Sequence, residues 1–292
     1  MNNLPQFTRQ DGPPLFPKAL YNRPVTRHGA GRLLVPGGHS GDLSLPTALH
    51  QLALAAGAGH CQVALPDTLV RLVAGAPDTT FVPASPSGSL GREALGPLLQ
   101  LAEDADALML GASLSNSSQT SILIERLVHE LNRPIIAFGD TLVAMQHHIE
   151  ELTNRPDCLI VATMPEVFKL AGQLGVSITV RRGGGLINKL EIVRDLAAAS
   201  RCHYAVYGTE IITAAGTDLV VTPTNYRLSL VPAAYYAVLG VTWLQNPSRR
   251  HDGLATGAYI LREAAAGLGD TDRPSVGQLA KSIAAVLARE SF

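Results

Sequence analysis

One stretch, Gly31 to Pro66, constrains the fold of this chain more than any other. It begins with a short apolar run, Leu33–Val35, which is typical of a strand buried on both faces and which stops at a glycine turn. A second apolar run, Cys61–Leu65, ends the stretch. Between the two runs, apolar residues recur at the spacing of one helix face, at Leu45, Leu49, Leu52, Ala53 and Ala56. Strand, turn, helix and strand in this order form a βαβ unit, which predicts parallel strands joined by a right-handed crossover.

The same alternation continues along the chain. Further buried strands are predicted at Thr80–Ala84, Ala107–Gly111, Pro134–Phe138, Cys158–Ala162 and His203–Tyr207. A hairpin follows, and three late helices are predicted at Pro232–Leu244, Gly253–Ala266 and Ser275–Arg289. No linker rich in Ser, Gly or charge divides residues 28–292. The pattern therefore predicts one open α/β domain, with helices on both faces of a mostly parallel central sheet.

Residues 1–27 differ from the rest because prolines are dense there, at Pro5, Pro13, Pro14, Pro17 and Pro24. This density is incompatible with a long helix. We expect an N-terminal arm that lies on the surface of the domain or on a neighbouring subunit and carries no chemistry.

The charge balance excludes several partners. With 23 basic and 24 acidic residues the net charge is −1, which gives no long-range attraction for nucleic acid or an anionic membrane. The longest apolar segment, Leu228–Leu244, contains Pro232 and Gly240 and is short for a bilayer, and the N-terminus has no secretory pattern. The three cysteines lie far apart and predict free buried thiols. We expect a cytoplasmic protein that holds a small ligand in a local pocket.

In open α/β sheets, ligands bind beyond the carboxyl ends of the strands. The residues that follow the predicted strands are therefore candidates for one binding crevice. They are Gly37, Gly38, His39, Ser40, Gly111, Ser113, Asp140, Glu166 and Gly208.

Each of these signals also has a structural alternative. Gly37 and Gly38 can bring backbone N–H groups close to a phosphate, or can serve only a tight turn. Asp140 and Glu166 can each bind a ligand, or can cap the helix that follows. The glycine turn matches neither a P-loop nor the dinucleotide fingerprint. No His or Cys pair has the spacing of metal ligands, so no metal site of that type is predicted.

Four segments carry a resemblance. Gly31–Gly38 reads GRLLVPGG, Leu52–Gly59 reads LALAAGAG, Asp106–Ser115 reads DALMLGASLS and Pro134–Leu142 reads PIIAFGDTL. In order and spacing they resemble motifs of the ADP- or ATP-dependent NAD(P)H-hydrate dehydratases, members of the ribokinase-like superfamily. The resemblance covers about residues 20–290. It implies a ribokinase-like three-layer αβα fold, a homo-oligomer, and a nucleotide-binding site that includes Tyr207, Gly208, Thr209 and Asn225.

The resemblance also implies a reaction, in which a hydrated nicotinamide cofactor is phosphorylated from ADP or ATP and then loses phosphate. The departures from the family pattern fall on that chemistry. Glu166 is kept but the family's nearby histidine is lost, and Tyr207 stands where the family has a cation. The family's glycine–aspartate loop, which forms an anion hole and supplies the base, aligns with Leu230–Ala234, and Ala234 cannot accept a proton.

Two functions follow from this. The first is a divergent relative with a degenerate catalytic loop and weak or no turnover. It would bind a nucleotide or dinucleotide, with ADP or ATP and Mg²⁺, or NAD(P) or its hydrate, as candidate ligands, or would serve as an assembly subunit. The alternative is an active dehydratase or small-molecule kinase in which Asp140 or Glu210 acts as the base. The residues favour the first function.

Overall fold

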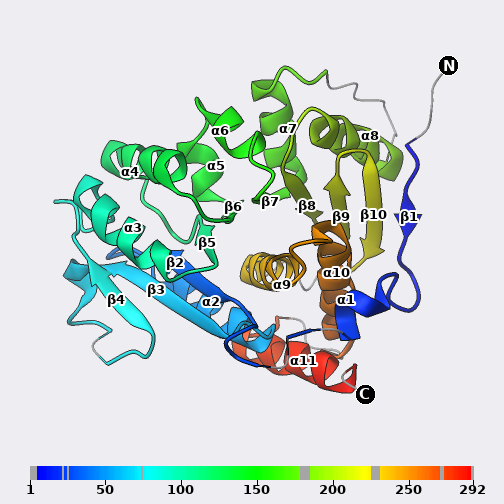
Figure 1. The fold of residues 1–292 in the computed structure, drawn as a ribbon, viewed down its shortest axis with the longest axis horizontal. Coiled ribbons are helices and arrows are strands. Elements are labelled where there is room, and N and C mark those ends of the chain that lie inside the picture. The colour runs from blue at the N-terminus through cyan, green and yellow to red at the C-terminus, as the bar shows by residue number, and fades with distance from the viewer. Residues whose placement is uncertain are drawn as a thin grey trace.

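The computed structural model describes residues 5–21, 23–24, 26–73, 75–177, 185–224, 231–269 and 273–290. Its centre is one ten-stranded sheet (Figure 1), in the order β1-β10-β9-β8-β7-β6-β5-β2-β3-β4. All neighbouring pairs from β8 across to β4 are parallel, which confirms the prediction of a mostly parallel α/β sheet. The strands are β1 (Thr8–Arg9), β2 (Arg32–Pro36), β3 (His60–Pro66), β4 (Thr79–Val82), β5 (Ala107–Leu110), β6 (Ile135–Phe138), β7 (Cys158–Thr163), β8 (His203–Tyr207), β9 (Glu210–Ala215) and β10 (Asp218–Pro223).

The predicted βαβ unit is confirmed. Strand β2 leads into helix α2, which leads into β3, and the two strands pair in parallel with Leu33 opposite Cys61 and Val35 opposite Val63. Side chains alternate across β2, so that Leu33 and Val35 join the core on one face while Leu34 joins the core on the other. A strand covered on both faces needs a continuous apolar run, which is what this segment provides.

Helices cover both faces of the sheet and give the fold three layers (Figure 1). One face carries α2, α9, α10 and α11, and the other carries α3 to α8. The helices are α1 (Pro17–Tyr21), α2 (Ser44–Ala55), α3 (Leu95–Glu103), α4 (Ser118–Glu130), α5 (Asp140–Ala144), α6 (Ile149–Thr153), α7 (Met164–Gln173), α8 (Gly185–Ala198), α9 (Pro232–Leu244), α10 (Arg250–Ala266) and α11 (Val276–Arg289), with short 3₁₀ helices η1 (Asp67–Leu69) and η2 (Arg92–Ala94).

Helix α9 has the bounds that the sequence predicts. Every residue from Ala233 to Trp243 is buried, because the helix packs on β5, β6 and β7 and is covered by α2 and α10. A helix that is apolar all round is one that is buried all round. Since β10 runs parallel to β8 and leads into α9, the first turn of α9 lies at the carboxyl edge of the sheet.

The N-terminal arm lies on its own domain. Its strand β1 pairs in parallel with β10, with Thr8 opposite Val220. The Gln10 side-chain amide donates to Thr222 Oγ1 at 3.0 Å and to the Ala255 carbonyl at 2.8 Å, and Arg262 donates to the Gln10 carbonyl. These bonds fix the arm to the edge of the sheet.

Some local predictions need correction. Between Asp67 and Ala74 the sequence also predicts a short helix, but the described residues of this segment form only the 3₁₀ turn η1, where Leu69 is the one buried residue and offers too little apolar surface to hold a longer helix. All three cysteines are free and buried, as predicted. None of the helices within the described ranges combines the length and apolar character needed to cross a membrane.

Candidate functional site

The strand ends of β2, β5, β6 and β7 meet at one edge of the sheet and bring most of the predicted site residues together. The turn after β2 is closed by two backbone bonds, from His39 N to Asp42 O at 3.1 Å and from Asp42 N to His39 O at 3.0 Å. His39 is half-buried and its Nδ1 accepts the Gly41 N–H, while Ser40 is exposed at the tip of the turn. This edge is the candidate crevice.

The glycines of this turn are explained by packing. The N–H of Gly37 donates to Ala64 O and that of Gly38 donates to Ala112 O, so neither N–H points at a ligand. A Cβ on Gly37 would lie 2.0 Å from Ala112 O, and one on Gly111 would lie 1.9 Å from Phe138 O. Of the two alternatives for the glycine turn, the geometry supports close approach of strand ends rather than a phosphate cradle.

Ser113 and Asp42 form the centre of the crevice. Ser113 has a φ of 53°, in the left-handed region that non-glycine residues rarely adopt, and it is buried. Its Oγ donates to Asp42 Oδ2 at 2.6 Å, and Asp42 Oδ1 accepts from the N and Oγ of Ser44. The hydrogen bonds from Ser113 and then Ser44 lower the pKa of Asp42, which keeps it charged. The sequence analysis missed Asp42, although it directly follows the His39–Gly41 turn.

Asp140 lies beside this pair at the start of α5. Its Oδ2 accepts the N–H of Leu114 at 2.8 Å. Burial raises the pKa of Asp140, and the charges of Asp42 and Glu166 raise it further, whereas the Leu114 hydrogen bond and His39 oppose the rise. Three carboxylates therefore influence one another across the crevice.

A pocket of about 360 Å³ opens next to Asp140. Ser115 in its wall belongs to a hydroxyl network, because its Oγ donates to Ser89 Oγ at 3.0 Å and lies 3.1 Å from Thr120 Oγ1. None of the lining residues is Lys or Arg. Hydroxyls and carboxylates suit a ligand's own hydroxyl groups, whereas a phosphate needs cations or free N–H donors. The lining residues are Leu114, Ser115, Asn116, Ser118, Thr120, Ser121, Ile122, Glu125, Asp140, Val143, Ala144, Gln146 and His147.

Glu166 caps helix α7. One of its carboxylate oxygens accepts the Thr163 N–H at 2.7 Å and the Thr163 hydroxyl at 2.6 Å. This arrangement is one half of a capping box. The helix-capping alternative for Glu166 therefore accounts for its position, and its charge reaches the crevice only through space.

The residues after β8 are held by contacts within the chain. Glu210 forms an ion pair with Lys189 Nζ at 3.0 Å and accepts the Thr209 hydroxyl at 2.6 Å. Burial alone raises the pKa of Glu210, but the hydrogen bonds from Thr209 and Lys189 outweigh it and lower the pKa overall. Glu210 is thus a poor proton acceptor. Gly208 has open space where a side chain would stand, and Asn225 lies outside the described residues.

An aromatic cluster, formed by Phe138, Tyr207, Tyr235 and Tyr236, fills the space over the first turn of α9. The rings of Phe138 and Tyr236 stack with centroids 4.0 Å apart, and those of Tyr207 and Tyr235 stack at 4.3 Å. The hydroxyls of Tyr207 and Tyr236 are 2.8 Å apart and hydrogen-bonded. Burial raises the pKa of both phenols, so both stay neutral.

Ala234, the position aligned with the family's catalytic aspartate, lies in the first turn of α9, directly before Tyr235 and Tyr236. It is 0% exposed, and its N–H donates to the Val231 carbonyl at 3.0 Å. Pro232 in the same turn has no N–H to offer. Within the described residues, this helix start therefore presents neither a base nor an anion hole. The sequence identified the loss at Ala234 but missed Tyr235 and Tyr236, although they directly follow it.

Nor do the described residues contain a group of three or more His, Cys, Asp or Glu side chains placed to hold a metal ion. The pocket beside Asp140 is suited to recognising hydroxyl groups, because its lining offers carboxylates and hydroxyls and contains no Lys or Arg.

No model of a known protein family matches the chain. The sequence is 30% identical over 157 residues to the bifunctional NAD(P)H-hydrate repair enzyme Nnr of Salinibacter ruber, a match that covers 51% of this chain and 29% of that enzyme. The chain thus spans less than a third of the length of the enzyme it matches. The resemblance expected from the motifs is confirmed.

Solved structures show that the fold is ribokinase-like. A ribokinase-like superfamily protein from Enterococcus faecalis superposes with a TM-score of 0.76 at 13% identity, covering 100% of this chain and 99% of that one. The ADP/ATP-dependent NAD(P)H-hydrate dehydratase of Bacillus subtilis, co-crystallised with ATP/Mg²⁺ and soaked with CoA, superposes with a TM-score of 0.63 at 15% identity, covering 96% and 100%.

Proposed function

We propose that this ribokinase-like chain, whose sequence resembles NAD(P)H-hydrate repair enzymes, is a catalytically degenerate relative of them that binds a nucleotide or dinucleotide with weak or no turnover. It holds the nucleoside part of its ligand in the pocket beside Asp140. The observation that carries the proposal is the complete burial of Ala234 at the start of α9.

The loss of a general base and of an anion hole predicts a large fall in the reaction rate. A general base and an oxyanion-type hole each contribute roughly 10²–10⁴ in rate. Ala234 has no proton acceptor and is 0% exposed, so a substrate hydroxyl cannot reach it. The rings of Tyr207 and Tyr236 pack against each other beside the start of α9, which supports a closed rather than an open helix start.

The pocket supports binding of the nucleoside part. Ribose offers hydroxyl donors and acceptors, which the carboxylate of Asp140 and the exposed side chains of Asn116 and Ser118 complement. ADP, ATP, NAD and NADP share this ribose, and the dehydratase from Bacillus subtilis was co-crystallised with ATP/Mg²⁺. Because the lining of this pocket contains no Lys or Arg, no phosphoryl-transfer step is assigned to it.

The activity test measures restoration of NADH from its hydrate in the presence of ADP or ATP and Mg²⁺. We expect a rate at least about 10⁴-fold below that of a competent dehydratase assayed in parallel, since two catalytic elements are missing. A rate within about tenfold of that enzyme would refute the degenerate assignment.

The binding test measures the melting temperature with ADP, ATP, NAD or NADP added. A ligand that binds only the folded state raises it. Ala144→Trp, which fills the pocket, should abolish the rise, whereas Ala285→Trp on the exposed side of α11 should preserve it. No rise with any of the four ligands would exclude nucleotide binding and leave an assembly role.

A second function, an active enzyme with Asp140 as base, is favoured by one observation. Burial raises the pKa of Asp140, which makes its carboxylate a stronger proton acceptor than an exposed one. If turnover is found, Asp140→Asn should abolish it and Glu210→Gln should not. An equal loss of turnover in both variants would contradict the assignment of Asp140 as the base.

A further inference from the structure

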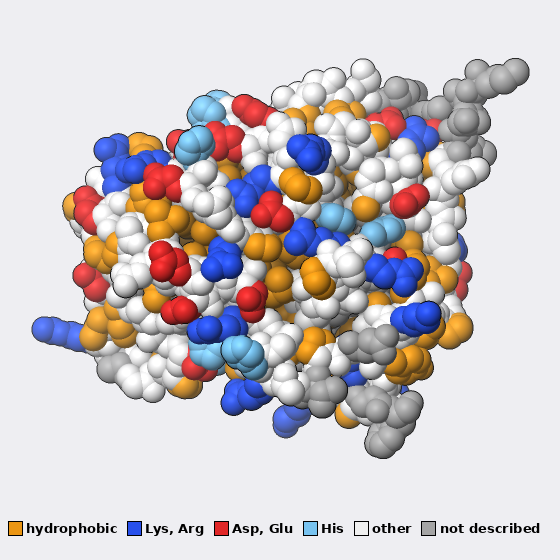
Figure 2. Space-filling view, viewed as in Figure 1, with side chains coloured by type: hydrophobic (Ala, Val, Ile, Leu, Met, Phe, Trp, Pro, Cys, Tyr) orange, Lys and Arg blue, Asp and Glu red, His pale blue; other side chains and the backbone are white. Residues whose placement is uncertain are grey.

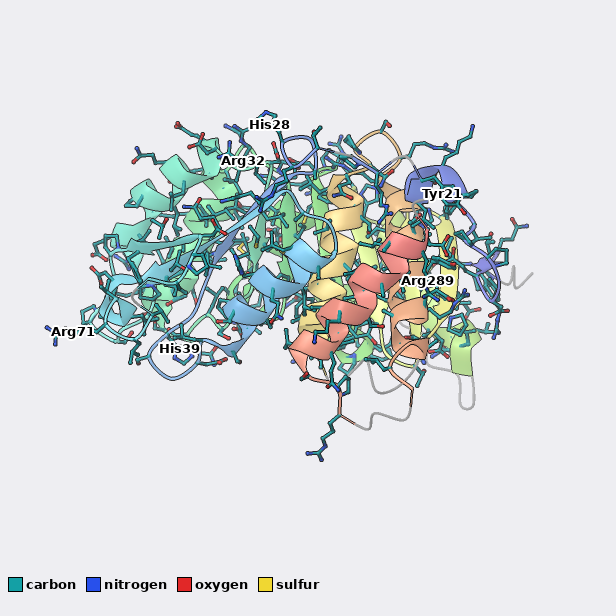
Figure 3. All side chains as sticks on the ribbon, turned by 90° about the horizontal axis from the view of Figure 1, so that it is seen from below. Tyr21, His28, Arg32, His39, Arg71 and Arg289 are labelled. Atoms are coloured by element: carbon teal, nitrogen blue, oxygen red, sulfur yellow. The ribbon has the colours of Figure 1, made fainter. Side chains whose placement is uncertain are left out.

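A second pocket lies at the edge of the sheet opposite the crevice, where β2 and β3 begin. Its volume is about 390 Å³, and it is lined by Arg27, His28, Arg32, Gly59, His60 and Asp78. Figure 3 shows His28 and Arg32 at one edge of the molecule and His39 of the crevice at the opposite edge. Strand β2 separates the two sites, and its five residues span about 17 Å. We call this second site the basic pocket.

Three positively charged or chargeable side chains of the basic pocket have no partner. The side chains of Arg27, His28 and Arg32 make no hydrogen bond or ion pair with the described part of the chain; only the backbone N–H of Arg32 is used, by Asp106. Figure 2 shows basic and histidine side chains gathered low on one face, near the start of β2 and β3. The guanidinium donors are therefore available to an external ligand.

The one acidic residue of the lining, Asp78, is paired with histidines rather than with the arginines. The two carboxylate oxygens of Asp78 face His60 Nε2 at 3.2 Å and His50 Nε2 at 3.4 Å. Asp78 has a left-handed φ of 55°, and its carbonyl accepts the Val63 N–H at 2.8 Å, which fixes the turn against β3. The carboxylate forms no ion pair with either arginine. The pocket thus keeps an excess of positive charge.

The walls of the pocket are fixed by close backbone packing. A Cβ on Gly59 would lie 1.7 Å from the Arg27 carbonyl oxygen, so only glycine lets the Arg27 segment approach the start of β3. Gly59 N–H donates to Gly31 O at 2.9 Å. From the end of α9, Gln245 Nε2 donates to Ala30 O at 3.0 Å. Arg27 is therefore carried on an anchored loop, and Arg32 is the first residue of strand β2.

We propose that the basic pocket binds a small phosphate-bearing anion, with Arg27 and Arg32 as the main donors. Arginine presents paired N–H groups that match the geometry of phosphate oxygens. His28 and His60 complete the lining on either side of the arginines. The site is independent of the crevice, because it uses none of the same residues and lies at the other end of β2.

The test is isothermal titration of the full chain with inorganic pyrophosphate, with inorganic phosphate and ADP as further arms. Arg27→Gln combined with Arg32→Gln should weaken pyrophosphate binding at least about tenfold, since each charge-assisted bond to phosphate is lost. The matched control, Arg71→Gln with Arg92→Gln, removes the same charge from exposed positions and should stay within about twofold. Figure 3 shows Arg71 far from the pocket. Circular dichroism confirms that each variant is folded.

A third variant, Gly59→Ala, keeps every charge but displaces the Arg27 segment, and should weaken binding as the double variant does. If ADP binds to the wild type and not to the double variant, the ligand of the basic pocket is a nucleotide. If pyrophosphate or phosphate binds and ADP does not, the ligand is the free anion. The proposal is overturned if wild-type protein binds none of them at about 10 mM, which corresponds to negligible affinity. It is also overturned if the double variant binds like its control, or if single-stranded RNA binds more tightly than pyrophosphate through the same arginines.

Discussion

The two halves of the crevice share one strand-end geometry but differ in what fills them. At the ends of β5 and β6, Leu114 and Asp140 border an open pocket of about 360 Å³. At the end of β8 and the start of α9, aromatic rings stack on one another and Ala234 has no exposed surface. The edge that binds ligands in this fold therefore remains open on one side, while packing closes the side where the related enzymes are expected to do their chemistry.

The aromatic packing that fills the closed half of the crevice also stabilises the fold. Stacked aromatic pairs contribute roughly 0.5–1.5 kcal/mol beyond the area that they bury. The hydroxyls of Tyr207 and Tyr236 form a hydrogen bond with each other, so these two polar atoms are buried at low cost, whereas the buried Tyr235 hydroxyl has no partner among the described residues. The open half instead keeps a left-handed serine and a partly buried carboxylate, features that cost stability and are typical of binding sites.

The largest expected effect tests the closed half. Tyr236→Ala should lower the free energy of unfolding by roughly 3–5 kcal/mol, because it leaves a cavity beside Phe138 and removes the partner of the Tyr207 hydroxyl. Urea denaturation measures this. Tyr21→Ala, at a residue that is 53% exposed, is the matched control and should change stability by no more than about 0.5 kcal/mol. A loss below about 1 kcal/mol in Tyr236→Ala would mean that the rings are not tightly packed.

The next largest effect is expected from a variant that restores the family's aspartate. Ala234→Asp places a carboxylate in a position that is 0% exposed, with no cation beside it among the described residues, and should cost about 3 kcal/mol at neutral pH. Ala285→Asp, on the exposed side of α11, should cost well under half as much. Urea denaturation compares the two. A stable Ala234→Asp variant that also gains turnover would show that the closed half opens readily.

The fold could be predicted because its evidence is local. Apolar residues close together in the sequence indicate which side chains are buried, as in the run Leu33–Val35 and the helix spacing from Leu45 to Ala56. A parallel sheet requires strands that are buried on both faces. The bounds of α9 follow from the same rule.

The site was harder to predict, because its contacts join residues distant in sequence. Phe138 stacks on Tyr236, and Asp42 accepts a hydrogen bond from Ser113, yet neither pair shares a local pattern. The glycines of the β2 turn gave an ambiguous signal, since a tight turn and a phosphate cradle need the same residue type. Only the direction of the N–H groups distinguishes the two alternatives.

A smaller effect separates strain from hydrogen bonding in the open half. Ser113→Ala keeps the left-handed backbone but removes the bond to Asp42, and should cost about 1 kcal/mol. Ser113→Gly removes the same bond but relieves the backbone, so it should be more stable than Ser113→Ala by about 1 kcal/mol. Thermal and urea unfolding of the pair measure the difference. Equal stabilities would show that the backbone at Ser113 is not strained.

The smallest effect concerns pH. Burial raises the pKa of Asp140, so the folded protein holds a proton there more tightly than the unfolded chain. The stability gained is fully present below the unfolded value of about 4 and is lost as pH rises through the folded pKa. Asp140→Asn keeps an acceptor for the Leu114 N–H but cannot titrate, so its stability should fall less than that of wild type between low and neutral pH.

Urea denaturation across this pH range measures the difference, with Glu150→Gln on the exposed face of α6 as the control. The effect should be small, because Asp140 is partly exposed and solvent screens its charge. A nucleotide bound through its ribose should enlarge it, since a ligand hydroxyl donating to Asp140 favours the charged form. The stability of Asp140→Asn and of wild type could instead show the same pH dependence with and without ligand. In that case the pKa of Asp140 is not perturbed and its carboxylate does not contact the ligand, so the open half would bind no better than the closed half.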